Sequence, residues 1–124
     1  DGVYKSGEYS TASDVAKLLK ESLPDKDYYK IFTTPTYVST KTERHPDGIK
    51  LSNDVISAFN KCKRKDFKVL GGKFGYTQEA GKSIAVLAEK NGKKYIVITL
   101  GCYNKGGNHG HMDDVITAMK KING

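Results

Sequence analysis

The first regular pattern along the chain is an amphipathic repeat near its beginning. Apolar side chains recur there at helical spacing: Ala12, Val15 or Ala16, Leu19 and Leu23. Thr11 and Asp14, three residues apart, form a capping-box pair at the start of the repeat, and Pro24 ends it. The pattern predicts a helix from about Ala12 to Leu23.

Two short runs rich in β-branched and aromatic residues follow this helix. They cover Tyr28–Thr33 and Tyr37–Thr42, with Pro35 between them. Such composition is typical of strands, so we expect a ribbon or an irregular hairpin here. The residues His45–Gly48 include proline, aspartate and glycine, which favour a turn.

The second half of the chain contains the stronger strand patterns. Phe67–Leu70 predicts a strand that leads into Gly71–Gly72. Ser83–Ala88 and Tyr95–Leu100 are nearly continuous apolar runs, which indicates strands covered on both faces. They flank Asn91–Gly92, and both residues of this pair tolerate the positive φ that a two-residue hairpin turn requires.

Two further helices complete the expected order of elements. Ser52 could cap a short helix that contains Val55, Ile56 and Phe59, and Met112–Ile122 has the apolar spacing of a closing helix. The fold class is therefore α+β, with helices packed against an antiparallel sheet. A length of 124 residues suits a single domain covering residues 1–124.

The charge of the chain favours anionic partners without identifying one. Lys and Arg number 21 against 14 Asp and Glu, for a net charge of +7. This charge favours binding to nucleic acid, to anionic lipid or to a bacterial wall, and it is equally compatible with a basic domain whose charges are only solvated. Its basic clusters, at 61–65 and 90–94, lack interleaved aromatic residues and favour solvated charge over nucleic-acid binding. No apolar run approaches the roughly 18 residues of a membrane span.

Two segments resemble ligand-binding motifs but fit them poorly. Residues 75–83 resemble a phosphate-binding loop, yet five residues separate the glycines where four are required, and Ser83 opens a strand instead of a helix. Several metal-ligand types gather near the end of the chain: Cys102, His109, His111, Asp113 and Asp114. The intervening glycines favour a loop with incidental histidines, so we expect no metal and no cofactor. Cys62 and Cys102 allow one disulfide, and the sequence leaves open whether it forms.

The segment 71–81 contains the most specific candidate chemistry. It places glycines and Lys73 on a strand that precedes a hairpin, an arrangement that sets an ammonium and open backbone N–H groups along a cleft for an extended anionic ligand. A tight connection made by the glycines is the alternative interpretation.

Gly72–Gly81, Ala85–Gly92 and Ile96–Gly101, together with Gly7–Ala16 upstream, resemble the serine D-alanyl-D-alanine carboxypeptidases. These are the low-molecular-mass penicillin-binding proteins that trim peptidoglycan. The matching segments occur in the right order over nearly the whole chain. The resemblance implies a partial penicillin-recognising fold, in which an antiparallel sheet is packed by helices, and an extracytoplasmic, secreted or wall-associated location.

The resemblance also indicates what this chain lacks. The family acylates a serine in a Ser-x-x-Lys motif and carries a second motif, Ser-x-Asn. None of the serines fits either motif: Ser6, Ser10, Ser13, Ser22, Ser39, Ser52, Ser57 and Ser83. We therefore expect either the carboxy-terminal part of a catalytic domain or a homologue that lost the front half. In both cases the chain alone is predicted to be inactive.

The family's third motif, Lys-Thr-Gly, is altered to Lys73-Phe74-Gly75. In the family the threonine hydroxyl helps hold the terminal carboxylate of the substrate, and Phe74 cannot donate that bond, which costs about 1.5–3 kcal/mol. Many relatives use an arginine before the final helix, where this chain has His109 and His111. The resemblance implies Lys73 as the catalytic residue and Phe74, Gly75, Tyr76 and Thr77 as substrate-binding residues.

Two functions are compatible with the sequence. One is a fragment of a carboxypeptidase that binds the peptidoglycan stem peptide, or a β-lactam, once the missing half completes it. The other is a non-catalytic module that binds cell wall or a protein partner. Because the missing half would leave sheet edges and apolar faces uncovered, we also expect a homodimer, a complementary chain or a rearranged fold.

Overall fold

Three long antiparallel strands form the centre of the protein in a computed structural model, which describes residues 6–63, 65–103 and 110–122. They are β3 (Lys68–Thr77), β4 (Gly81–Lys90) and β5 (Lys93–Cys102), in the order β3-β4-β5. The register pairs Phe74 with Ile84 and Val86 with Val97. The sheet predicted from the apolar runs is confirmed, and β3 continues through the glycines that were expected to follow it.

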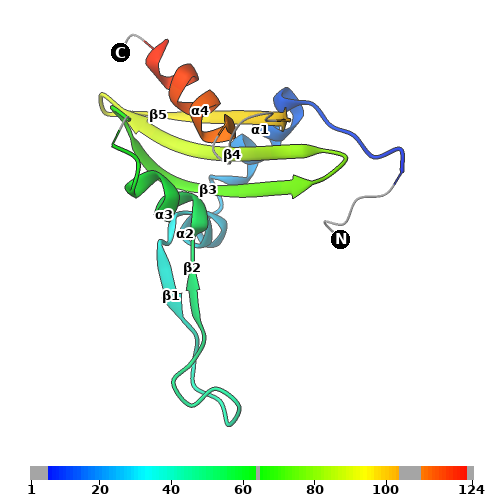
Figure 1. Cartoon of the computed structure of the whole chain (residues 1–124). Helices are drawn as coiled ribbons and strands as arrows, with labels where there is room; N and C mark the ends of the chain where they lie inside the picture. The colour runs from blue at the N-terminus through cyan, green and yellow to red at the C-terminus, as the bar shows by residue number, and fades with distance from the viewer. Residues whose placement is uncertain (1–5, 64, 104–109, 123–124) are drawn as a thin grey trace.

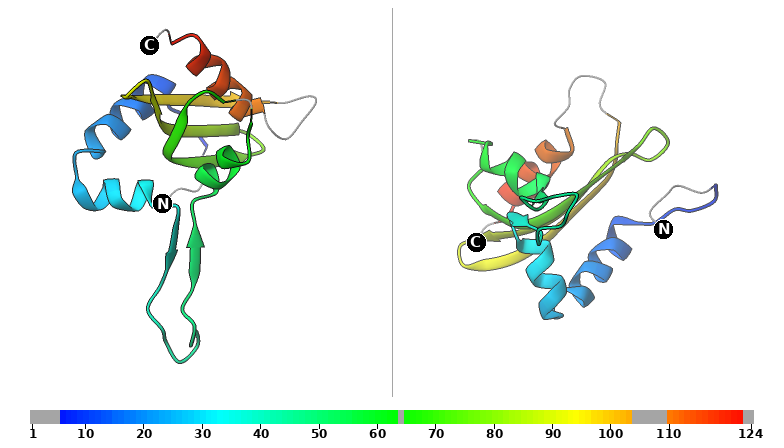
Figure 2. Two further views of the ribbon diagram at one scale, coloured as in Figure 1. Left: turned by 90° about the vertical axis from the view of Figure 1, so that its left-hand side faces the viewer. Right: turned by 90° about the horizontal axis from the view of Figure 1, so that it is seen from below.

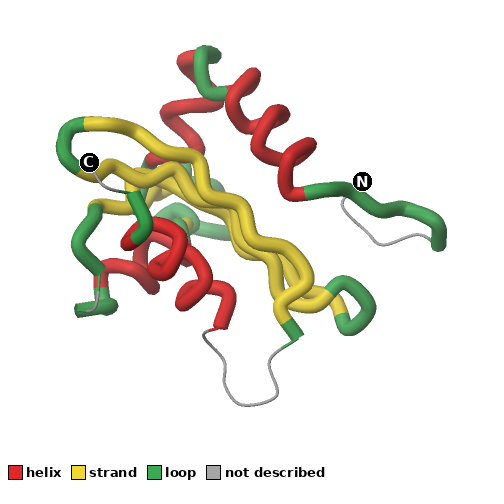
Figure 3. The backbone as a smooth tube through the Cα atoms, turned by 90° about the horizontal axis from the view of Figure 1, so that it is seen from above, coloured by secondary structure: helices red, strands yellow, loops and turns green. Residues whose placement is uncertain are grey.

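Helices cover both faces of this sheet, as Figures 2 and 3 show. On one side lie α1 (Ala12–Ser22) and α2 (Lys26–Thr33), which contact β5 and β3. On the other side lie α3 (Asp54–Asn60) and α4 (Gly110–Lys120). The α+β class is confirmed, and the three layers explain why the strands are apolar on both faces.

The main hydrophobic core lies between the sheet and the α3–α4 layer. It joins α3 through Phe59 and α4 through Val115 and Met119 to the strand residues Val86 and Ala88, all of which are fully buried. Residues alternate between the two faces of a strand, so Ala85 and Leu87 face the α1–α2 layer. This second layer buries less, since Leu19 is the sole buried hydrophobic residue that α1 and α2 contribute.

Local signals at the first helix and at the last hairpin are confirmed. The Thr11 hydroxyl accepts a hydrogen bond from the Asp14 N–H at 3.1 Å and caps α1. Asn91 and Gly92 have φ values of 51° and 74°, which is the backbone of a two-residue hairpin turn between β4 and β5.

The expectation of a strand over Tyr28–Thr33 is wrong, because this segment forms α2. The Asp25 carboxylate accepts a hydrogen bond from the Tyr28 N–H at 2.8 Å and caps the helix. Phe32 then packs against the backbone at Gly71, and this tertiary contact favours the helix over the strand preference of its residues.

The predicted ribbon exists with different partners. β1 (Thr36–Val38) pairs with β2 (Lys50–Ser52), with Tyr37 opposite Leu51. Residues 36–52, which we call the arm, project away from the sheet (Figure 1) and carry the predicted turn His45–Gly48 in their loop.

The two helices on the core side also agree with the pattern, with shifted ends. Asn53 caps α3 by accepting from the Ile56 N–H at 3.1 Å, whereas Ser52, the residue we expected there, ends β2. The closing helix begins two residues before Met112 and ends at Lys120. Cys62 and Cys102 are not joined by a disulfide. None of the helices formed by the described residues has the length and apolar character that crossing a membrane requires.

Candidate functional site

The position of β3 is fixed by close approach of a helix on each face. A Cβ atom at Gly71 would lie 2.4 Å from the Phe32 carbonyl oxygen, and one at Gly72 would lie 2.5 Å from a Val55 methyl group. Real Cβ atoms do not come this close to other atoms, so α2 and α3 can pack here only because both residues are glycine. The strand is thus held at the two residues that precede Lys73.

Asn53 adds a polar connection at the same place. Its side-chain amide donates to the carbonyl oxygens of Phe32 and Gly72, each at 3.2 Å, while its Oδ1 caps α3. Its backbone N–H donates to the Pro35 carbonyl at 2.9 Å. One residue therefore connects α2, the segment that leads into the arm, α3 and β3. The sequence contained only its capping signal, an Asn before an acidic and then apolar run.

Lys73 lies on the α1–α2 face of β3 and borders a hollow of about 290 Å³. Its side chain is exposed, and its ammonium donates to the Phe74 carbonyl. The walls of the hollow are mostly apolar and come from both helices and all three strands: Val15, Leu18, Leu19, Tyr28, Phe32, Ile98 and Leu100 are among them. Ser83, which sequence reasoning did not select, also borders it.

Phe74 packs on the opposite, core side of the strand. Its ring is half-buried, and its centroid lies 5.0 Å from that of His111 in an edge-on arrangement. His111 is buried in the first turn of α4. The aromatic pair joins the strand next to Lys73 with the closing helix, a contact that the sequence pattern did not reveal.

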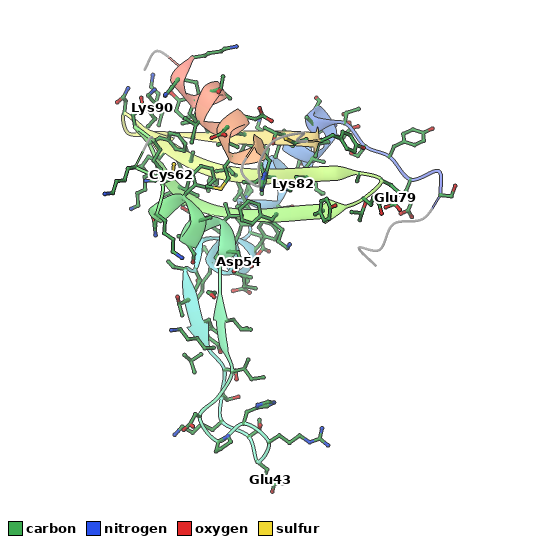
Figure 4. The ribbon with its side chains drawn as sticks, in the orientation of Figure 1. Glu43, Asp54, Cys62, Glu79, Lys82 and Lys90 are labelled. Carbon is green, nitrogen blue, oxygen red and sulfur yellow. The ribbon has the colours of Figure 1, made fainter. Side chains whose placement is uncertain are left out.

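The other proposed substrate-binding residues continue along β3 toward the β3–β4 turn, where Glu79 is labelled in Figure 4. Gly75 and Tyr76 are exposed. The Thr77 hydroxyl accepts a hydrogen bond from the Ala80 N–H at 3.0 Å and helps to build the turn. Lys73, Phe74 and Gly75 all border the hollow, whereas Tyr76 and Thr77 do not.

Two polar contacts connect the helices to the sheet. The Tyr29 hydroxyl lies 3.0 Å from the Lys94 ammonium and raises the pKa of Lys94, which links α2 to β5. The Lys90 ammonium lies 3.0 Å from the Asp66 carboxylate and also donates to the Met119 carbonyl at 2.9 Å. The hydrogen bond from Lys90 lowers the pKa of Asp66, and the same ammonium favours the carbonyl end of α4.

The metal-ligand types of the sequence do not form a site among the described residues. In residues 6–63, 65–103 and 110–122, no three His, Cys, Asp or Glu side chains are grouped so that they could hold an ion. Cys102 ends β5, while His111, Asp113 and Asp114 lie on α4. His109 lies outside the described residues.

Residues 1–104 match the sequence profile of the D-alanyl-D-alanine carboxypeptidase family. No curated protein matches the sequence. Among solved structures, the fold is similar to a D-alanyl-D-alanine carboxypeptidase from Mycobacterium tuberculosis H37Rv, with a TM-score of 0.73 and 20% identity over 96% of this chain and 43% of that one. It is also similar to an evolved penicillin-binding protein homologue from Mycobacterium tuberculosis, with a TM-score of 0.69 and 18% identity over 96% of this chain and 44% of that one. The chain thus spans less than half the length of either.

Proposed function

The chain belongs to the D-alanyl-D-alanine carboxypeptidase family, and from this membership we propose that it forms the carboxy-terminal part of a peptidoglycan-processing catalytic domain. In this proposal the 124 residues supply the sheet and one edge of the cleft, and a further polypeptide segment supplies the serine nucleophile. The place of action is the cell wall, outside the cytoplasmic membrane.

The observation that carries the proposal is the apolar hollow beside Lys73. An ammonium at the border of a hollow with mostly apolar walls is a suitable neighbour for a serine that must lose its proton during attack. The solved carboxypeptidase has more than twice the length that this chain covers, so the family fold includes enough additional chain to fill such a space.

The proposed chemistry is acyl transfer from a peptide that ends in D-Ala-D-Ala. The serine oxygen attacks the carbonyl of the penultimate residue, the terminal D-alanine leaves, and water then releases the shortened peptide from the serine. Lys73 contributes positive potential near the nucleophile and the substrate carboxylate. Gly75, Tyr76 and Thr77 line the path of the extended peptide. Phe74 stands where relatives have the threonine whose hydroxyl binds the carboxylate.

Labelling with a fluorescent β-lactam tests this proposal, because a β-lactam acylates the same serine. We expect the purified 124-residue chain to show no covalent label on denaturing gels and no adduct in its intact mass. A longer polypeptide that adds a Ser-x-x-Lys segment should become labelled in a stoichiometric amount, and Lys73→Ala should reduce that labelling. A stoichiometric adduct on the 124-residue chain would contradict the assignment of the nucleophile to another segment.

A second candidate is a non-catalytic module that binds cell wall or a protein partner. The presence of Phe74 where relatives have threonine favours this second candidate, because a strand that need not hold a carboxylate can use the position for packing against His111. Sedimentation of the chain with insoluble peptidoglycan would support this function if Lys73→Ala reduced the bound fraction. Absence of binding together with labelling of the longer polypeptide would exclude this second candidate and retain the catalytic proposal.

A further inference from the structure

A stripe of exposed apolar side chains runs from α2 onto the arm. It consists of Ile31, Tyr37, Leu51 and Ile49, whose side chains are 77%, 56%, 55% and 43% exposed. Tyr37 pairs with Leu51 across the ribbon, and the Ser39 N–H donates to the Ile49 carbonyl at 2.9 Å, which extends the same register. Alternation along the strands therefore places the three arm residues of the stripe on one face.

Three residues of the stripe, Ile31, Tyr37 and Leu51, border a hollow of about 700 Å³ between α2 and the arm. Asp27, Lys30, Ile31 and Thr34 line its helical wall, and this spacing corresponds to one face of a helix. Tyr37 and Leu51 form the opposite wall. None of the lining residues is shared with the hollow beside Lys73, so the two surfaces are separate.

Backbone hydrogen bonds give the arm a defined conformation, which keeps the stripe in place. Thr42 and His45 exchange backbone hydrogen bonds at 3.0 and 3.1 Å, and the Gly48 N–H donates to the His45 carbonyl at 2.9 Å. A two-stranded ribbon is marginally stable alone in water, and every residue of β1 and β2 is exposed. Apolar side chains on such a ribbon gain most if another molecule covers them.

The geometry points to a second copy of this chain as the molecule that covers the stripe. In a two-fold contact the same patch meets itself, so a residue pair occurs twice, once in each direction. Asp27 and Lys30 suit this symmetry because both are exposed and lie three residues apart on the face of α2 that borders the hollow. When two such helices meet in opposite directions, Asp27 of each copy comes within reach of Lys30 of the other, beside the two Ile31 side chains.

The area that a stable dimer requires explains the use of the arm. Specific interfaces bury about 800 Å² on each partner, which is more than four partly exposed side chains supply. If the arm of one copy lies across α2 of the other copy, it adds the buried area that the four side chains do not supply. A lipid surface fits less well, because the tip of the arm carries Lys41, Glu43, Arg44 and Asp47, and these polar groups would reach a membrane before the stripe does.

Sedimentation velocity of the whole chain over a range of concentrations tests the inference. We expect the wild-type chain to sediment with twice the mass of one chain at micromolar concentration. Ile31→Glu and Leu51→Glu should each raise the dissociation constant about ten-fold or more, because each would bury an unpaired charge in the contact. Lys30→Asp should also weaken the dimer, and the double variant Asp27→Lys with Lys30→Asp should restore it.

Two matched variants locate the contact. Val38→Glu places the same charge on the opposite face of the arm, and Leu18→Glu places it on an equally exposed residue beside the other hollow. Both should leave the dissociation constant unchanged, and circular dichroism checks that every variant is folded. A monomeric wild-type chain, or a dimer that Leu18→Glu dissociates and Ile31→Glu does not, would overturn the inference. Neither result depends on β-lactam labelling, so this inference and the proposed function can fail separately.

Discussion

The side-chain amide of Asn53 donates to the carbonyl oxygen of Gly72 at 3.2 Å, one residue before Lys73. The same amide donates to the Phe32 carbonyl, so the edge of the candidate cleft is connected through one side chain to the end of α2. A short loop between β2 and α3 thus controls where β3 lies.

We therefore expect replacement of Asn53 to destabilise the fold strongly. Asn53→Ala removes a helix cap and leaves two carbonyl groups without their donor, which should lower the free energy of unfolding by about 2–4 kcal/mol. Asn53→Asp keeps an acceptor for the cap but cannot donate, so it should remain well below wild type in urea denaturation. Ser52→Ala, at the exposed neighbouring residue, should change stability by less than about 0.5 kcal/mol. An Asn53→Asp variant as stable as wild type would show that the two carbonyl contacts contribute nothing.

The turn between β4 and β5 provides a test of backbone conformation alone. Gly92 has a φ of 74°, and a Cβ atom placed there would meet no atom within 4 Å. Gly92→Ala should consequently cost about 1 kcal/mol of unfolding free energy through backbone strain, without any clash. Gly75→Ala is the matched control, because Gly75 has no positive φ and its Cβ would make one ordinary contact at 3.9 Å. Equal losses in the two variants would contradict the assignment to backbone strain.

Phe74 should prove to be a packing residue when the family motif is restored. Phe74→Thr recreates Lys-Thr-Gly but removes the ring that contacts His111, so it should lower the free energy of unfolding by about 1–3 kcal/mol. Tyr76→Thr, which truncates a largely exposed ring on the same strand, should have little effect in the same thermal or urea denaturation. A Phe74→Thr variant with unchanged stability would contradict the conclusion that Phe74 occupies this position for packing.

The ion pair between Lys90 and Asp66 makes the stability of the fold depend on pH in the acidic range. The hydrogen bond from Lys90 holds the pKa of Asp66 below its ordinary value of 3.8 in the folded state. The stabilising effect of the pair is therefore fully present above the pKa of the unfolded chain and is lost as pH falls through the lower, folded value. Wild type should melt at a higher temperature than Asp66→Asn at pH 7, and the difference should shrink below about pH 4.

Salt provides the control for this pair. The Asp66 side chain is partly exposed, so raising the ionic strength at pH 7 should also reduce the difference in melting temperature. A difference that stays constant from pH 7 to pH 2 would assign the effect of Asp66→Asn to something other than the charge.

The sequence predicts most of the sheet because its signals there are local. The Asn91–Gly92 turn sets which strands are adjacent, and unbroken apolar runs on both sides of it require cover on both faces. The Thr11–Asp14 pair likewise determines the start of α1 without help from distant residues.

The sequence fails where distant contacts decide the structure. Tyr28–Thr33 has strand composition, and its helix depends on the Asp25 cap, on the Lys94–Tyr29 contact and on the space that Gly71 leaves for Phe32. The turn signal at His45–Gly48 marks the loop of the arm, but it does not specify that Tyr37 pairs with Leu51 across that loop. At the site, the family resemblance selected Lys73, but the roles of Asn53 and His111 arise from elements that meet only in three dimensions.

The contacts at Gly71 and Gly72 have a consequence for how this protein can change over evolutionary time. Helices on both faces meet the strand at its main chain, so the location of Lys73 depends little on the size of the side chains around it. Surrounding positions are then free to vary as long as the two glycines persist. A chain that is 20% identical to a solved carboxypeptidase can in this way keep a similar fold.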